Sequence, residues 1–157
     1  MRLEELEAVC QEAARGLLER EGRPLAPAVV LPLPQATRVL TLAGFPDDDL
    51  ARAHALGDLA ADEMRPVSAP CYGFVAEAEQ PDGQPLLVVV YGARGHQPRI
   101  TAAMLHAEGL GEWVEAEELH PDAMVFLRPL QAAAEHADPA KPAGGSLPNW
   151  PAGNAPS

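Results

Sequence analysis

The chain has 157 residues and a formal net charge of −12, and hydrophobic residues make up 47% of it. This length is typical of a single domain with a sizeable core. The negative charge repels phosphates, which argues against nucleic acid and anionic membrane surfaces as partners. No apolar run approaches the ~20 residues that a membrane-spanning helix needs.

The cysteines and the basic residues indicate the setting in which the protein works. Cys10 and Cys71 form no metal-binding or redox motif. We expect both to be reduced core thiols of a cytoplasmic protein. Ten of the eleven basic residues are arginine, with Lys141 the exception. This bias is typical of coding by a GC-rich bacterial genome.

An amphipathic helix is predicted over residues 2–21, before the break at Gly22. Its apolar positions recur every three or four residues, at Leu3, Leu6, Cys10, Ala13 and Leu17. This spacing places them on one face, which favours a helix that covers the core. The alternative is a two-helix dimer seam, because the same spacing fits a heptad.

Two short strands and a second helix follow. The strands are predicted over residues 28–31 and 37–42, and prolines in the connection favour a turn or an exposed edge. Asp47 is expected to cap a helix that runs to about Met64, and the two following aspartates complement its dipole. A helix start explains these three aspartates better than a metal site, because calcium loops place their ligands at alternate positions.

A β-hairpin is predicted at the centre of the chain, over residues 70–91. Pro81, Asp82 and Gly83 fit a three-residue turn with a G1 bulge, which pairs residues whose numbers sum to 164. Phe74 then faces Val90, on a wholly apolar face, and the opposite face is mixed and expected to be half covered. The alternative is a type I′ turn at Asp82 and Gly83, which shifts the pairing by one residue.

The remaining elements are a loop, a strand, an acidic segment and a short helix. The loop covers residues 92–98, and a fifth strand is predicted over 99–105. Residues 108–122 carry six carboxylates and no lysine or arginine. A last strand or packed extended segment is expected at 124–127, and a short helix at 130–136. The fold predicted is α+β, in two layers: a mainly antiparallel sheet of about five strands with two helices on one face.

Residues 1–136 are expected to form one domain, and residues 137–157 a disordered tail rich in proline and glycine. Trp150 stands out within this tail, because an aromatic residue in a disordered segment can anchor a protein partner.

One basic cluster is the candidate ligand site. Arg94, His96 and Arg99 lie close together, next to glycines that free the backbone, and this set can hold a carboxylate or phosphate. Its alternative is an ordinary polar loop. Cys71 with His96 or His106 is a second candidate, as a thiol–imidazole pair, although buried packing is the commoner role of such a cysteine. No zinc, nucleotide-binding or hydrolase motif is present, so no cofactor and no metal are expected.

Two functions are therefore predicted. The first is a non-catalytic protein-interaction or scaffold domain that binds a protein partner or forms a homodimer. The alternative is a binder of small anions, or an enzyme, that uses the loop with Arg94, His96 and Arg99.

Overall fold

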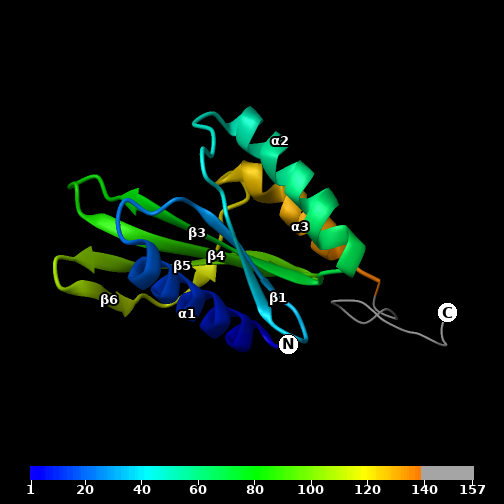
Figure 1. The fold of residues 1–157 in the computed structure, drawn as a ribbon, viewed down its shortest axis with the longest axis horizontal. Coiled ribbons are helices and arrows are strands. Elements are labelled where there is room, and N and C mark those ends of the chain that lie inside the picture. The colour runs from blue at the N-terminus through cyan, green and yellow to red at the C-terminus, as the bar shows by residue number, and fades with distance from the viewer. Residues whose placement is uncertain (139–157) are drawn as a thin grey trace.

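The computed structural model describes residues 1–138, and its elements are shown in Figure 1. The helices are α1 (Leu3–Glu21), α2 (Asp49–Leu59), which continues as a π-helical turn (Ala60–Met64) and a 3₁₀ turn (Arg65–Val67), and α3 (Arg128–Glu135), which follows a 3₁₀ turn (Val125–Leu127). The strands are β1 (Ala28–Pro32), β2 (Thr37–Thr41), β3 (Cys71–Glu79), β4 (Pro85–Ala93), β5 (His96–His106), β6 (Gly109–Trp113) and β7 (Glu117–Glu118).

The strands form one antiparallel sheet in the order β2-β1-β3-β4-β5-β6, and β7 pairs with β5 beside β6. The predicted α+β class with an antiparallel sheet is confirmed. Within residues 1–138 the sheet has seven strands, because the acidic segment at 108–122 supplies β6 and β7.

The central hairpin has the predicted register, with Phe74 opposite Val90 and Ala78 opposite Leu86. The turn closes with a hydrogen bond of 2.8 Å from Gly83 N to Gln80 O. Gly83 has φ +88°, a left-handed conformation that glycine adopts without strain. The three-residue turn is therefore confirmed, and the type I′ alternative is wrong.

Helix α1 covers one face of the sheet. Its buried residues are Leu6, Cys10, Ala14 and Leu17, and they share a cluster with Val30, Val75, Leu87 and Val89 of the sheet. The predicted core-covering role of this helix is confirmed. Because this stripe is already buried within the chain, it is not available as the alternative dimer seam.

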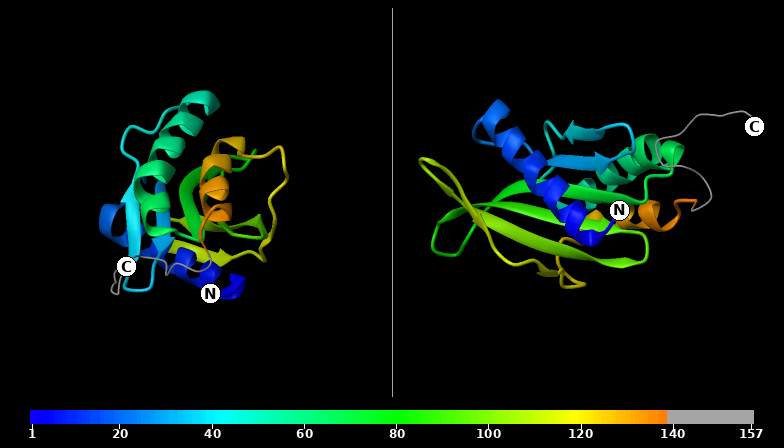
Figure 2. Two further views of the ribbon diagram at one scale, coloured as in Figure 1. Left: turned by 90° about the vertical axis from the view of Figure 1, so that its right-hand side faces the viewer. Right: turned by 90° about the horizontal axis from the view of Figure 1, so that it is seen from below.

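Helices α2 and α3 lie against the other face, as Figure 2 shows. Their cluster includes Leu56, Leu130, Tyr72 and Val90. Three phenylalanines meet there edge to face or tilted, with ring centroids 5.7 to 6.1 Å apart: Phe45, Phe74 and Phe126. Two helices do share one face, as expected, but α1 adds a third layer. Apolar spacing shows which side of a helix is buried and carries no information about which face of the sheet buries it.

Three local boundaries differ from the predictions. Asp48, not Asp47, caps α2 by accepting a 3.0 Å hydrogen bond from Ala51 N. The expected loop at 92–98 is a tight turn at residues 94–95, because β4 and β5 both extend into it. The segment 125–127 is a 3₁₀ turn rather than a strand. Among the described helices, none combines the length and hydrophobicity needed to cross a bilayer.

Candidate functional site

The predicted basic cluster lies at the β4–β5 turn and in the first half of β5. Nη1 of Arg94 donates a 2.9 Å hydrogen bond to the carbonyl of Ala137, just after α3. Nη2 of Arg99 donates a 3.0 Å bond to the carbonyl of Ala116, before β7. His96 is exposed at the start of β5. The two guanidinium groups therefore bind backbone carbonyls of different segments.

Hydrogen bonds made by two residues of α3 hold this helix against the turn. The side-chain amide of Gln131 donates to the carbonyls of Ala93 and His96, at 3.1 and 3.2 Å. The carboxylate of Glu135 accepts a bond from Gly95 N at 3.1 Å. With Arg94, these contacts give the turn a structural role in holding the C-terminal helix.

Tyr91 and Arg99 belong to a second polar group, under α1. The hydroxyl of Tyr91 donates a 3.0 Å hydrogen bond to Glu7 of α1. Burial, followed by the contact with the Glu7 carboxylate, raises the pKa of Tyr91, and the hydrogen bond with Arg99 lowers it in part. The protonated phenol therefore anchors α1 to the sheet.

The second candidate pair joins Cys71 to a histidine. Cys71 is buried in the cluster under α1, and burial raises the pKa of its thiol. His106 lies at the opposite end of β5 from His96, and the β3–β4 and β4–β5 pairing places Cys71 at the His96 end. Cys71 and His106 are therefore kept apart. Within residues 1–138, no hydrogen bond joins Cys71 to His96, and no cluster of metal-binding side chains is formed.

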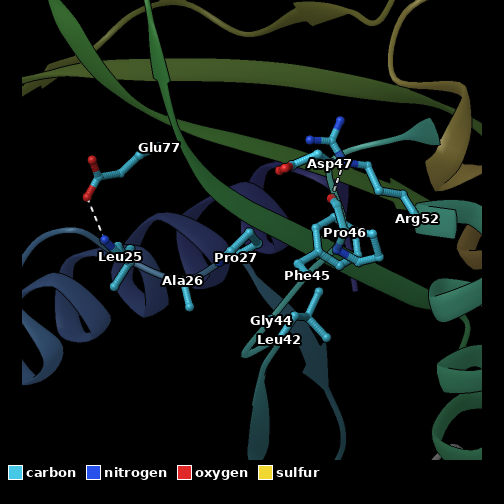
Figure 3. A pocket seen from close by; sticks show the side chains of 10 residues that line it. All are labelled: Leu25, Ala26, Pro27, Leu42, Gly44, Phe45, Pro46, Asp47, Arg52 and Glu77. Atoms are coloured by element: carbon cyan, nitrogen blue, oxygen red, sulfur yellow. Dashed lines mark hydrogen bonds between the residues drawn. The ribbon is translucent and has the colours of Figure 1, made fainter.

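A shallow pocket of about 370 Å³ lies between the segment before β1, the segment after β2 and Glu77 of β3 (Figure 3). One of its two acidic residues, Glu77, accepts a 2.7 Å hydrogen bond from Leu25 N and pairs with Arg23 at 3.2 Å. Its basic group, Arg52, donates to the carbonyl of Pro46 at 2.7 Å and lies over the Phe45 ring. The side chains of Glu77 and Arg52 are thus engaged by the fold itself, and Asp47 is the third charged residue that lines the pocket.

A larger surface is left by the unequal covering of the two sheet faces. Neighbouring residues of a strand point to opposite faces. In β4, Leu87 and Val89 are fully buried under α1, whereas Leu86 and Val88 on the other face are only partly buried. Figure 1 shows the cause: α2 and α3 lie over one end of that face, and no described helix covers the other end.

The same alternation continues in β5. Ala103 and Leu105 are buried, but Ala102 is partly exposed and Met104 is 43% exposed. We call this less covered surface the open face, formed by Ala76, Ala78, Leu86, Val88, Ala102 and Met104. Ala76 and Val88 lie at its inner edge, where they pack against the cluster under α2 and α3. Val114, which is 58% exposed, adjoins it through a 2.8 Å bond from its backbone N to Ala102 O.

This assignment corrects an expectation. The mixed face of the hairpin was expected to be half covered, but α1 buries it, and the wholly apolar face is the one left partly open. Both faces continue to the tip of the hairpin, so the length of the strands carries no signal of which face the helices cover.

Carboxylates border the open face. The exposed ones are Asp82 at the tip of the β3–β4 hairpin, Glu112 in β6, and Glu108 and Glu115 on either side of β6. Residues 66–93 and 100–127, which supply all of the open face, contain no lysine or arginine. The surface is therefore apolar at its centre and negative at its rim.

Trp150, the predicted partner anchor, lies outside the described residues, as does most of the predicted tail. Comparison of the chain with protein-family models, with curated proteins and with solved structures gives no match.

Proposed function

We propose that the protein is a non-catalytic protein-interaction domain of the cytoplasm that binds a partner protein on its open face. The observation that carries the proposal is the partial exposure of Leu86, Val88 and Met104, on strands whose alternate residues are buried. Apolar surface of this kind is stabilised by removal from water, and contiguous patches of it mark interaction sites.

The rim of the open face favours a particular kind of partner. Carboxylates such as Asp82, Glu112 and Glu115 border it, and residues 66–93 and 100–127 contain no lysine or arginine. An apolar segment flanked by lysine or arginine complements the apolar centre and the negative rim of the open face. Its apolar residues cover the strands, and its positive charges lie beside the carboxylates. A second copy of this chain would instead bring another negative rim against the first.

Binding of a defined peptide tests this proposal. The probe is a synthetic amphipathic helix of about 14 residues, built from leucine and lysine at helical spacing. We expect the wild-type protein to bind it, and binding to weaken with added salt, because salt screens the rim. Leu86→Asp and Met104→Asp should each weaken binding roughly tenfold or more.

The matched control is Leu50→Asp. Leu50 is 83% exposed near the start of α2, outside the open face, so the same chemical change there should leave binding unaltered. Equal binding by the wild type, the Leu86 variant and the Leu50 variant contradicts the proposal. Circular dichroism of each variant verifies that the fold is retained.

The alternative, a small-anion site at the β4–β5 turn, has weaker support. Arg94 and Arg99 already donate to backbone carbonyls, and His96 is exposed. A thermal-shift screen with phosphate and small carboxylates tests it, since a ligand of the native state raises the melting temperature. A shift that Arg94→Ala and Arg99→Ala remove would favour this alternative over the open face.

A further inference from the structure

Among the described strands, β2 forms one edge of the sheet and pairs with β1 alone. The hydrogen bonds from Leu42 N to Pro27 O, at 2.8 Å, and from Leu33 N to Ala36 O, at 3.2 Å, extend the β1–β2 register at both ends. Because hydrogen-bonded pairs alternate along an antiparallel ladder, Arg38 and Leu40 bond to β1.

The three other residues of β2 face outward with their backbone. Thr37, Val39 and Thr41 lie at non-bonded positions of the β1–β2 ladder, so their N–H and C=O groups point away from the sheet. No backbone bond from these groups is present within residues 1–138. Such a row of free donors and acceptors is a template for another strand.

This edge lacks the features that usually protect an edge strand. Natural proteins place lysine, proline or a bulge on such strands, whereas β2 reads Thr-Arg-Val-Leu-Thr. Its one charged residue, Arg38, lies on the face that α2 covers, where it pairs with Glu63 at 2.7 Å. The protein has a net charge of −12, but β2 itself contains no aspartate or glutamate that would repel a second copy.

The side-chain pattern of β2 is symmetric about its central residue. Thr37 and Thr41 lie on either side of Val39, and all three share one face. We propose that two copies of the chain pair through β2, antiparallel, about a two-fold axis at Val39, so that the two sheets become continuous.

The pairs formed across this axis are complementary. Val39 faces Val39 of the second copy, and Thr37 faces Thr41 of the second copy, in matched apolar and hydroxyl pairs. Each outward residue exchanges both backbone hydrogen bonds with its opposite. On the other face Arg38 lies opposite Leu40 of the second copy, so no like charges meet. This dimer leaves the open face on β3, β4 and β5 free, and it is independent of the proposed function.

Sedimentation equilibrium over a concentration series, reaching roughly 1 mM, measures the mass of the protein in solution. We expect a monomer–dimer equilibrium that shifts toward dimer with added salt, because salt screens the repulsion between two negative molecules. Val39→Lys sets two ammonium groups opposite each other and should give a monomer. Leu50→Lys, the same kind of change away from the edge, should leave the equilibrium unchanged.

Disulfide trapping tests the register directly, and it remains informative if Val39→Lys reduces stability. A hydrogen-bonded cross-strand pair has Cα atoms ~5.5 Å apart, within disulfide range. Val39→Cys faces itself across the axis and should cross-link under mild oxidation. Thr41→Cys alone should not, because it faces Thr37, whereas the double variant Thr37→Cys/Thr41→Cys should. The native thiols are buried.

Three results overturn the proposal. The first is a monomer at every concentration and salt level. The second is a dimer that Val39→Lys leaves intact, which places the interface elsewhere. The third is cross-linking of Thr41→Cys as readily as Val39→Cys, which is inconsistent with a two-fold axis at Val39.

Discussion

The hydroxyl of Tyr72 donates a 2.9 Å hydrogen bond to Oε1 of Gln131, so that a residue of β3 is bonded to a residue of α3 across β4. The backbone of Gly92 lies beneath this bond. A Cβ at that position would come within 2.5 Å of the Tyr72 oxygen and 2.6 Å of the Gln131 oxygen. The bond therefore requires glycine at this point of β4.

Gly92→Ala should destabilise the protein by roughly 1–3 kcal/mol, because the added methyl group displaces the Tyr72–Gln131 bond and forces α3 from the sheet. The control is Gly57→Ala in α2, where a new Cβ meets nothing within 4 Å. That change should instead stabilise by roughly 0.5–1 kcal/mol, through the better helix propensity of alanine. Urea denaturation measures the unfolding free energy of each variant. Equal changes at Gly92 and Gly57 would contradict the close contact at Gly92.

Leu86 and Leu87 are neighbours in β4 on opposite faces of the sheet. Leu87→Ala should cost about 2–5 kcal/mol of unfolding free energy, since Leu87 is fully buried under α1. Leu86→Ala should cost under about 1 kcal/mol, because its side chain already contacts water. Similar losses from the two variants would show that the open face is covered in solution.

Both native thiols should be inert in the folded protein. Burial raises the pKa of Cys10 to about 12 and raises that of Cys71 as well, and the thiolate is the reactive form. Ellman's reagent at pH 8 should react slowly with the native protein and fully in urea. A Leu50→Cys variant, with an exposed third thiol, should react at once at that site alone.

Stability should fall in alkaline solution. The pKa values of Cys10, Tyr72 and Tyr91 are all raised by burial in the folded state. These groups keep their protons in the native protein at pH values where the unfolded chain has lost them. The stability that they contribute is therefore complete below the unfolded pKa values and is lost as the pH rises from there through the folded ones. The ordinary pKa values are 9.0 for cysteine and 10.0 for tyrosine.

Urea midpoints measured from neutral pH to about 11 should therefore decline beyond pH 9. Tyr72→Phe should be less stable at neutral pH, because it loses the bond to Gln131, yet its decline above pH 10 should be shallower. A midpoint that stays constant up to pH 11 would contradict the raised pKa values.

Local chemistry was sufficient to predict the central hairpin. The turn from Gln80 to Gln84 sets the register within a few residues, so proline, aspartate and glycine in sequence specify it. The short C-terminal helix and the stripe of α1 were predictable for the same reason, since the relevant spacing is local.

The role of the basic cluster was not predictable in this way. Arg94 meets Ala137, and Gly95 meets Glu135, across at least forty residues of sequence. Three basic residues close together in sequence indicate an anion site only if their N–H groups are free to bind an anion. Here Arg94 and Arg99 donate to backbone carbonyls instead. The open face was also missed, because an apolar strand face reads the same whether a helix covers it or not.

The two apolar clusters differ in how much of the chain must be synthesised before they can close. The cluster under α1 draws its residues from Leu3 to Ala116. The cluster under α2 and α3 draws on Leu130, Ala133 and Ala134 near the end of the described chain. During translation, the α1 side can therefore assemble first, while Tyr72 and Phe74 stay accessible on the nascent chain until α3 leaves the ribosome. The order of synthesis thus allows the α1 face of the sheet to close before α3 supplies the residues that complete the other face.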